Sequence, residues 1–514
     1  MAKTKKDRSE RRSIMDRLLG PIERIGNRLP HPFMLFIYLG VAIMLLSGIL
    51  AWAGASYTDP GTGEATSVQT LLSGEGVRYL LTETIPNFVN FPPLGVVLGV
   101  MLGIGLAQQT GMLEAAIRHT ILRAPKALLT YSIMLVGVMG NLASDAAFVI
   151  IPPLAAFVFH RVGRHPLAGL AAGFAAVGAG FTANVVIAGT DALLSGVATQ
   201  AAQTVSEGFV VTPVDNYYFM FVAAIILPVV GVLITERVIE PRLGTYDGPE
   251  AEQNESNTEV TAEQRAGLKA AAIFGAVFLA IIAVAAAIPG SPLRDDDGGL
   301  VPSPLLDGVV PLVVLFFVTM SVAYGLKAGT IKHTKDVPLH MTEAMKSMAG
   351  FIVLIFAAAQ FIAYIEWTNI AGWLAVTGAE GLQAANLTGL GTIAGFVVLA
   401  AILNLVVFSG SAQWALMAPV FVPLFMLLGY HPAFVQAAFR IADSSTNIVT
   451  PMNPYMLIVL AFMKEYDPKA GVGTLISTMV PYMLAFFAVF AVLLFGFAGL
   501  GLPFGPGVTV ELPQ

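Results

Sequence analysis

The stretch PAFVQAAFRIADSSTNIVTPMNPY, residues 432–455, contains the clearest indication of the fold. It begins as an apolar helix, places Arg440 and Asp443 three residues apart, and continues into a run of four polar residues. Two prolines follow before apolar residues resume. In a water-soluble protein this pattern predicts the end of a helix and a loop. In a membrane it predicts a broken transmembrane helix, where a charge at the bilayer centre costs roughly 2.5–3.5 kcal/mol.

The composition of the chain decides between these two environments. The 514 residues are 56% hydrophobic and 12% charged, whereas an ordinary soluble domain has about 25% charged residues. Apolar runs of about 20 or more residues recur along the chain, as is typical of transmembrane helices. We therefore predict an all-α polytopic membrane protein. The absence of cysteine excludes disulfides, thiolate metal sites and a cysteine nucleophile.

Charges between the apolar runs predict the orientation of the chain. Lys and Arg cluster before the first run, which places the N-terminus in the cytoplasm by the positive-inside rule. We predict about nine transmembrane helices plus two re-entrant hairpins, at 127–159 and 409–430. Two spans, 166–198 and 432–463, are broken. The predicted segments are a cytoplasmic basic N-terminal segment (1–31), a first half (32–236), a cytoplasmic linker (237–265), two scaffold helices with loops (266–348), a second half (349–500) and an external tail (501–514).

The two halves share an internal repeat. Ser144, Pro152 and His165-Pro166 recur as Ser411, Pro419 and His431-Pro432, at offsets of 266 or 267 residues. Basic residues near the first copy of the His-Pro pair place it in the cytoplasm, whereas none lies near the second copy. The copies are therefore predicted to be inverted. Inverted repeats with a hairpin and a broken helix in each copy are typical of secondary transporters, whose site lies at the membrane midplane where the breaks meet.

Charged residues at the two breaks are the main candidates for function. Asp443 either binds sodium or a proton, or it neutralises Arg440 one turn away. Arg440 either binds a substrate carboxylate or sulfonyl group, or it serves as the partner of Asp443. Asp191, at the break in the first half, either takes part in transport or caps the second part of its helix.

Residues around the predicted hairpins are weaker candidates. Trp414 either stacks on an aromatic substrate or marks a membrane interface, and Pro432 is expected to begin a helix. Asp145 is a doubtful candidate. Polar and glycine residues that supply oxygens, tight turns or support for the breaks are Asn141, Thr182, Asn184, Asn404, Ser409, Gly410, Ser411, Gln413, Asn447 and Asn453.

Competing classes of function are disfavoured by the sequence. It contains no HExxH motif and no Gly-Lys dipeptide, so neither a zinc hydrolase of that class nor a P-loop ATPase is expected. The energy source is then an ion gradient. An intramembrane hydrolase would need a Ser-Lys pair, a Ser-His pair or a metal site at depth, and no Lys or His is clearly in mid-span. Paired breaks with carboxylates favour alternating access over a passive channel. We expect no enzyme activity, no organic cofactor and no nucleic-acid partner.

Two blocks of sequence resemble the AbgT family of aminobenzoyl-glutamate transporters. One is LLSGEGVRYLLTETIPNFVNFPPLGVVLGVMLGIGLAQQTGML (71–113), and the other is NLVVFSGSAQWALMAPVFVPLF (404–425) followed by FRIADSSTNIVTPMNPY (439–455). The resemblance implies nine transmembrane helices and two re-entrant hairpins per subunit, in a homodimer embedded in lipid in the bacterial inner membrane. It also implies transport positions at Asp191, Trp414, Pro432, Arg440 and Asp443, and sodium ligands at Asn404 and Asp443.

The same resemblance implies the class of substrate. Members of the family transport p-aminobenzoyl-glutamate, p-aminobenzoate and sulfonamides. We expect a secondary transporter, coupled to protons, sodium or both, that exports p-aminobenzoate-like metabolites and sulfonamides. The alternative is a sodium- or proton-coupled importer of p-aminobenzoyl-glutamate or a related carboxylate.

Overall fold

A computed structural model describes residues 30–58, 63–143, 145–246 and 260–512. Most of the predicted N-terminal segment, the linker residues 247–259 and Ser144 lie outside these ranges. Within them the chain is almost entirely helical, with one short antiparallel hairpin in which β1 (Ser56–Thr58) pairs with β2 (Ala65–Ser67). Nine helical stretches of the described chain are long and apolar enough to cross a membrane. The predicted class, an all-α polytopic membrane protein, is confirmed.

The helices have the following bounds. In the first half they are α2 (Pro32–Trp52), α3 (Gly74–Val89), α4 (Pro92–Gln109), α5 (Met112–Leu122), η1 (Lys126–Leu128), α6 (Leu129–Val138), η2 (Met139–Ala143), α7 (Asp145–Arg161), α8 (Pro166–Ala179), α9 (Gly189–Gln203), α10 (Tyr217–Ile234), η3 (Thr235–Ile239) and α11 (Glu240–Leu243). In the remainder they are α12 (Ala262–Ala287), α13 (Pro304–Asp307), α14 (Val309–Ala328), α15 (Asp336–Ser347), α16 (Ala349–Trp367), α17 (Ile370–Ala384), α18 (Leu390–Asn404), α19 (Gly410–Leu427), α20 (Pro432–Thr446), α21 (Tyr455–Tyr466) and α22 (Val472–Leu500).

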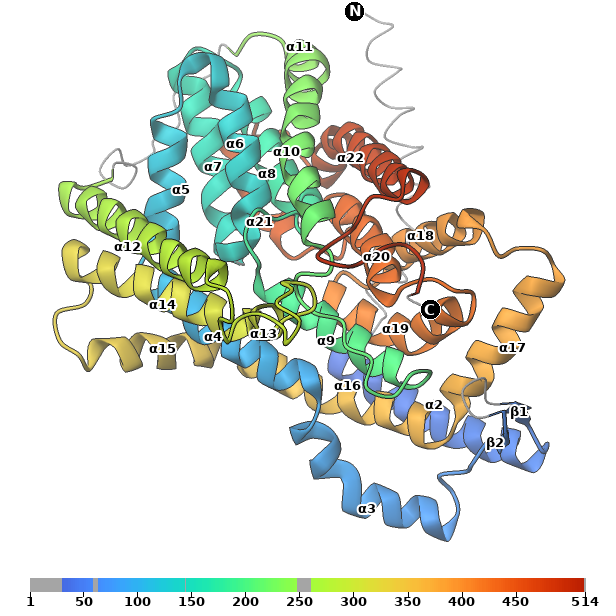
Figure 1. Ribbon diagram of the computed structural model, residues 1–514. Coiled ribbons are helices and arrows are strands. Elements are labelled where there is room, and N and C mark those ends of the chain that lie inside the picture. Colours follow the sequence, from blue (N-terminus) through green and yellow to red (C-terminus); the bar gives the residue numbers. More distant parts are fainter. Residues whose placement is uncertain (1–29, 59–62, 144, 247–259, 513–514) are drawn as a thin grey trace, which may run out of the picture.

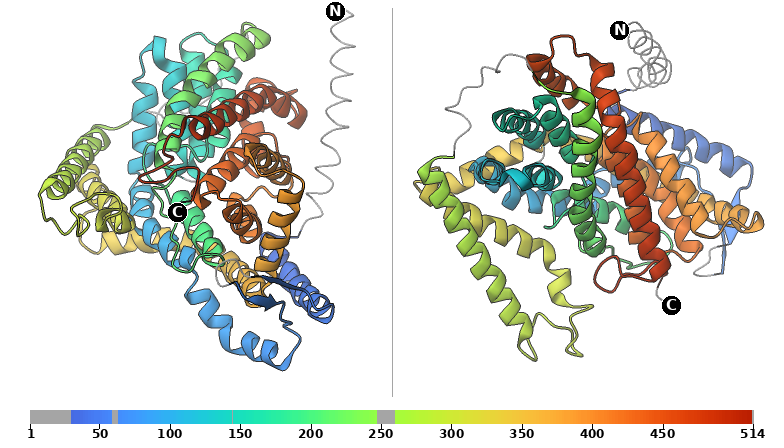
Figure 2. Two further views of the ribbon diagram at one scale, coloured as in Figure 1. Left: turned by 45° about the vertical axis from the view of Figure 1, so that its right-hand side comes forward. Right: turned by 90° about the horizontal axis from the view of Figure 1, so that it is seen from above.

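The two broken helices lie in the middle of the molecule. Helices α12 and α14 pack side by side on one flank, at the left of Figure 1. Helix α4 packs against both α14 and α15, and α15 lies below α14 in this view. Helices α2, α16 and α17 lie on the opposite flank. Helices α10 and α22 run alongside each other across the molecule in the view from above (Figure 2). Every residue of α8 and α20 is buried, so these two helices form the centre of the fold.

Small residues allow α7 and α8 to approach closely. Helix α8 has the sequence PLAGLAAGFAAVGA, in which Gly and Ala predominate. A Cβ atom built on Gly169 would lie 2.4 Å from the carbonyl oxygen of Ala155 in α7. Close packing through small residues is a common way in which helices associate in membranes, where lipid gives no hydrophobic drive for their association.

Replacing Gly169 by alanine is expected to destabilise the protein by about 1–3 kcal/mol, because the added methyl group collides with the backbone of α7. The matched control is Gly99→Ala in α4, since a Cβ atom there meets nothing within 4 Å. The control is expected to be neutral or to stabilise the helix by up to about 1 kcal/mol. Thermal unfolding of the purified variants in detergent measures both effects. Equal melting temperatures for the two variants would contradict the close packing.

Three predicted boundaries are wrong. Residues 409–430 are not broken, because α19 is continuous despite Pro419 and Pro423, and the interruption lies before it, at 405–409. The span predicted at 349–376 is divided between α16 and α17 at Asn369, which has a left-handed backbone with φ of 59°. The linker predicted from residue 237 begins later, because η3 and α11 continue α10 to Leu243.

The order of elements agrees with a repeat, although the inversion of the two halves and the re-entrant course of the hairpins stay predictions. In both halves a helix begins at the His-Pro pair. His165 Nδ1 accepts the amide of Leu167, at 3.2 Å, and His431 Nδ1 accepts the amide of Ala433, at 3.1 Å. Each of these helices is preceded by a helix with two internal prolines, α7 or α19, and followed by a break.

The C-terminal tail packs against the body of the protein. The amide of Tyr218 donates to the carbonyl of Phe504, at 2.9 Å, and the amide of His431 donates to that of Val510, at 2.8 Å. Phe504 is fully buried. The tail, the start of α10 and the turn before α20 therefore lie at one end of the molecule, and the sequence predicts that all three are external.

Burial raises the pKa of the Asp215 carboxyl, beside this tail, from an ordinary value of 3.8 to about 6. The carboxylate accepts hydrogen bonds from the amide and hydroxyl of Thr212, which oppose the shift only in part. A raised folded-state pKa means that the folded protein binds the proton more tightly than the unfolded chain does. The resulting stability is present below about pH 4 and is lost as the pH rises through about 6.

We expect the apparent melting temperature to fall between pH 4 and pH 7 by an amount that corresponds to at most about 3 kcal/mol. The Asp215→Asn variant cannot titrate at this position, so its melting temperature should fall less over the same range. Thermal unfolding at a series of pH values measures the difference. Parallel profiles for the two proteins would show that Asp215 makes no such contribution.

Candidate functional site

The first break separates α8 from α9. Residues 180–188 are not helical, and their backbone groups need partners because lipid supplies none. Asn141, in η2, donates its side-chain amide to the carbonyl of Phe181. Asp191, in the first turn of α9, accepts the amide of Ala188, at 2.7 Å, and so caps that helix. The capping role predicted for Asp191 is therefore present.

The second break separates α20 from α21 and is supported in the same way. Asn404, at the end of α18, donates its side-chain amide to the carbonyl of Asp443, at 2.7 Å, and to Asn447 Oδ1, at 3.0 Å. Asn453 donates to the carbonyl of Asn447, at 2.9 Å, and its Oδ1 accepts the amide of Tyr455, also at 2.9 Å. The asparagines predicted to support the breaks perform this role.

The two breaks contact each other directly. Thr182 Oγ1 lies 2.6 Å from Ser444 Oγ, and the amide of Thr182 donates to the same oxygen, at 3.3 Å. Both residues are buried. The polar groups that interrupt two helices about 260 residues apart therefore form one continuous polar centre inside an apolar protein, as predicted from the sequence.

Arg440 is the only cation buried at this centre among the described residues, with none of its side chain exposed. Its Nη2 atom donates to the carbonyl of Thr182, at 2.9 Å, and forms an ion pair with Asp191. The predicted partner, Asp443, lies on the same helix but is not the residue that pairs with Arg440. The interpretation of Arg440 and Asp443 as a salt link is therefore wrong, and the ion pair instead joins the two breaks.

Part of the Arg440 guanidinium is available for a further ligand. Within the described chain, Nε and Nη1 are buried and have no hydrogen-bond partner. A buried guanidinium normally satisfies its donors, since an unpaired polar group in the interior costs free energy. Each of the two unpaired nitrogens can therefore donate a hydrogen bond to a further acceptor, such as an oxygen of an anionic ligand.

Asp443 also lacks a complete set of partners. It is 3% exposed, and its Oδ1 atom is buried without a hydrogen-bond donor from the described residues. The carboxylate packs against Gly410, at the start of α19, where an added Cβ atom would lie 2.7 Å from Oδ2. Asn404 Oδ1 is likewise buried and unpartnered. Asp443 and Asn404 therefore each contribute an unpaired oxygen atom at the second break, and oxygens of this kind are the ligands of hard cations such as sodium.

Trp414 is placed differently from either of its predicted roles. It is fully buried on α19, so it does not mark a membrane interface. Its Nε1 atom donates to the carbonyl of Leu194 in α9, at 2.9 Å, and its ring lies 4.7 Å from that of Phe439 in α20. In this conformation Trp414 joins three helices of the centre, and Phe439 covers the ring where a substrate would stack.

The other predicted residues lie at the starts of helices. Pro432 is the first residue of α20 and is buried, in agreement with its expected structural role. Ser411 is half-buried in the first turn of α19, with its Oγ 3.1 Å from that of Ser409. No contact described for either residue joins it to Arg440 or Asp443.

One residue of this region was missed. Gln436 lies four residues before Arg440 on α20, is 1% exposed, and has an Oε1 atom that is buried without a partner in the described structure. Residues four apart lie on the same face of a helix. A single glutamine in an otherwise apolar run was therefore the signal in the sequence, because its spacing places it on the face of Arg440.

Comparisons with known proteins show the family of this chain. Residues 17–512 match the model of the "AbgT putative transporter family". The chain is 43% identical, over 497 residues, to the p-aminobenzoyl-glutamate transport protein of Escherichia coli (strain K12), covering 96% of this chain and 97% of that protein.

Two solved structures are similar over nearly their whole length. The Alcanivorax borkumensis YdaH transporter has a TM-score of 0.88 and 38% identity, covering 93% of this chain and 100% of that chain. Neisseria gonorrhoeae MtrF, whose structure illuminates a class of antimetabolite efflux pumps, has a TM-score of 0.90 and 37% identity. The match covers 96% of this chain and 100% of that chain. These relatives are transporters rather than enzymes. The chain is a polytopic membrane protein of the AbgT transporter family.

Proposed function

We propose that this protein is a cation-coupled secondary transporter of the bacterial inner membrane that exports p-aminobenzoate-like metabolites and sulfonamides. The names of its relatives support the substrate class: one carries p-aminobenzoyl-glutamate, and another belongs to a class of antimetabolite efflux pumps. The positive-inside rule supports a cytoplasmic N-terminus. The homodimer is part of the same proposal and rests on the family resemblance.

The observation that carries the proposal is the incomplete charge cluster at the centre. Arg440 contributes one positive charge and Asp191 and Asp443 two negative charges, so a net negative charge is buried when both carboxylates are ionised. An uncompensated charge at this depth is costly. A bound cation or proton at Asp443 removes it, which couples occupation of the site to an ion.

Sodium fits the residues present. Asp443 Oδ1 and Asn404 Oδ1 are buried and unpaired among the residues that the structure describes, and Asn404 also binds the backbone carbonyl of Asp443. These two side chains would hold the ion, and the ion would supply positive charge next to Arg440. A proton on Asp443 would neutralise the same carboxylate without needing Asn404 as a ligand.

The substrate is recognised by its anionic group. The unpaired Nε and Nη1 atoms of Arg440 can each donate a hydrogen bond to an oxygen of a carboxylate or a sulfonyl group. A substrate anion adds negative charge to the cluster, so substrate and cation each change the binding of the other. This mutual effect would couple their passage through the same pair of breaks.

Import of p-aminobenzoyl-glutamate is the second candidate. The 43% identity to the Escherichia coli transport protein favours it, because that identity exceeds the 37% shared with MtrF. The charge cluster is compatible with either direction of transport. A site that is exposed alternately to the two sides of the membrane moves its substrate in the direction that the ion gradient drives.

Transport by the purified protein in liposomes separates these alternatives. Radiolabelled p-aminobenzoate, sulfamethazine and p-aminobenzoyl-glutamate are each tested with an imposed sodium gradient, an imposed proton gradient, or neither. We expect accumulation only with a gradient. Accumulation of a sulfonamide in intact cells then gives the direction: expressing cells should contain less than cells without the protein. Higher accumulation in expressing cells would refute export, and equal uptake without any gradient would refute coupling.

A further inference from the structure

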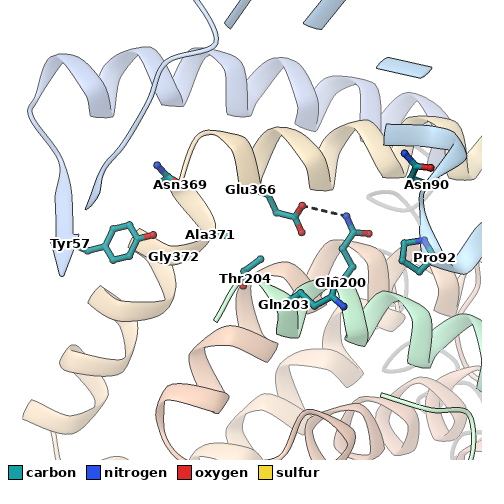
Figure 3. A pocket seen from close by; sticks show the side chains of 10 residues that line it. All are labelled: Tyr57, Asn90, Pro92, Gln200, Gln203, Thr204, Glu366, Asn369, Ala371 and Gly372. Carbon is teal, nitrogen blue, oxygen red and sulfur yellow. Dashed lines mark hydrogen bonds between the residues drawn. The ribbon is translucent and has the colours of Figure 1, made fainter. Parts of the chain in front are cut away.

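A polar pocket lies away from the central charge cluster, at the far end of α9. Its volume is about 380 Å³, and it is bordered by the ends of α3, α9 and α16, the starts of α4 and α17, and strand β1. We call it the Glu366 pocket after the carboxylate in its wall (Figure 3). Nine residues of α9 separate Asp191 from Gln200 in this pocket, a helical rise of about 14 Å. The pocket is therefore distinct from the centre.

Its lining favours a ligand that donates hydrogen bonds. None of the ten lining residues is Lys, Arg or His, whereas Glu366 contributes a carboxylate. The hydrogen bond that the structure gives this carboxylate is a long one, 3.4 Å from Gln200 Nε2. The Oε1 atom of Gln200 is buried and has no partner within the described chain. Two hydrogen-bond acceptors therefore lie side by side, and both can accept further hydrogen bonds from a ligand. The Glu366 carboxylate would repel an anionic ligand.

The rest of the lining is mostly polar but includes one aromatic ring. Figure 3 shows the Tyr57 ring on one side of the pocket and Pro92 on the other, with Glu366 and Gln200 between them. A volume of about 380 Å³ lies in the range of small-molecule sites and far exceeds that of a bare ion. The pocket therefore has room for a small ligand that combines hydrogen-bond donors with a ring that can pack against Tyr57.

We propose that the Glu366 pocket is a second binding site, which takes a primary aromatic amine. The amine N–H groups donate to the Glu366 carboxylate and to Gln200 Oε1, and the ring lies toward Tyr57. The choice of an aromatic amine over other donors rests on the proposed function, in which the sulfonamide substrates carry such a group. A molecule in the pocket is separate from one at the centre, because the two sites lie at opposite ends of α9.

Binding to the purified full-length protein tests this proposal with two probes that differ only in the amine. 4-Aminobenzamide has the aromatic amine and no carboxylate, and benzamide lacks the amine. We expect 4-aminobenzamide to bind at least about tenfold more tightly than benzamide, as measured by calorimetry. The Glu366→Gln variant should lose this tenfold difference. The control variant Glu380→Gln, at an exposed carboxylate of α17, should retain it.

A second variant keeps the test decisive if Glu366→Gln does not fold. A Cβ atom on Gly372 would lie 2.2 Å from the Tyr57 hydroxyl, so Gly372→Ala displaces the Tyr57 ring and should weaken binding of 4-aminobenzamide about tenfold. Equal affinities for the two probes, or unchanged binding in a folded Glu366→Gln or Gly372→Ala variant, would overturn the proposal. Amine-dependent binding without gradient-driven transport would refute the proposed function and leave the pocket assignment intact.

Discussion

Replacing Arg440 by alanine is expected to abolish transport and to lower the free energy of unfolding by about 3–5 kcal/mol. The substitution leaves Asp191 as a buried carboxylate without its ionic partner, because the described ion pair of Asp191 is the one with Arg440. It also removes the hydrogen bond from Nη2 to the carbonyl of Thr182. The first break would keep the contact of Thr182 with Ser444 as a polar link to α20. Thermal unfolding and transport in liposomes measure the two consequences separately.

A double-mutant cycle distinguishes loss of the ion pair from loss of substrate binding. Arg440→Gln combined with Asp191→Asn removes both charges and should recover part of the stability that either single change loses. It should not recover transport, because the anion-binding guanidinium is absent. Arg440→Lys keeps the charge but not the planar donors, so it should remain partly stable and inactive. Additive losses of stability in the cycle would argue against a direct coupling of Arg440 and Asp191.

Replacing Asp443 by asparagine is expected to weaken the activation of transport by the cation while the fold is retained. The change deletes the negative charge and leaves a side chain of almost the same size against Gly410. Loss of an interaction with a charged ligand costs about 1.5–3 kcal/mol, which corresponds to a roughly tenfold to hundredfold weaker activation by the cation. The measurement is the initial rate of uptake at increasing sodium concentration, and at a series of pH values.

Asn404→Ala separates a sodium site from a proton site at Asp443. If sodium is the coupling ion, this variant should also require a higher sodium concentration, because it removes the Oδ1 ligand. It would be expected to weaken the second break as well, since Asn404 binds the carbonyl of Asp443, so its melting temperature is compared with that of Asp443→Asn. An unchanged dependence of transport on the cation in Asp443→Asn would place the cation elsewhere.

The fold class follows from the sequence because membrane burial leaves strong local signals. Long apolar runs predict spans, and polar residues with Gly or Pro predict where a span breaks. Both breaks were located in this way, at 180–188 and after Thr446. The second hairpin segment was located less reliably. Residues 409–430 were expected to be broken, but α19 continues through Pro419 and Pro423, since neighbouring helices can satisfy the backbone groups that a proline leaves unpaired.

The partners of the candidate residues could not be predicted, because they depend on contacts between distant segments. Arg440 and Asp443 are one turn apart in the sequence, yet Arg440 pairs with Asp191, 249 residues away. Trp414 was expected at a substrate or at an interface, and instead it bonds to the backbone of Leu194. The Glu366 pocket had no signal in the sequence, since its lining comes from six separate elements.

By itself, the sequence determined that this protein is a polytopic helical membrane protein with two polar breaks that contain its buried charges. Hydropathy and helix breaking are properties of consecutive residues, so they can be read from the chain. Only the tertiary structure decided that Arg440 joins the two breaks through Asp191, and that Asp443 and Asn404 keep unpaired oxygens. The physical reason is that a buried charge takes the partner that packing brings within hydrogen-bond distance, which need not be the nearest one along the helix.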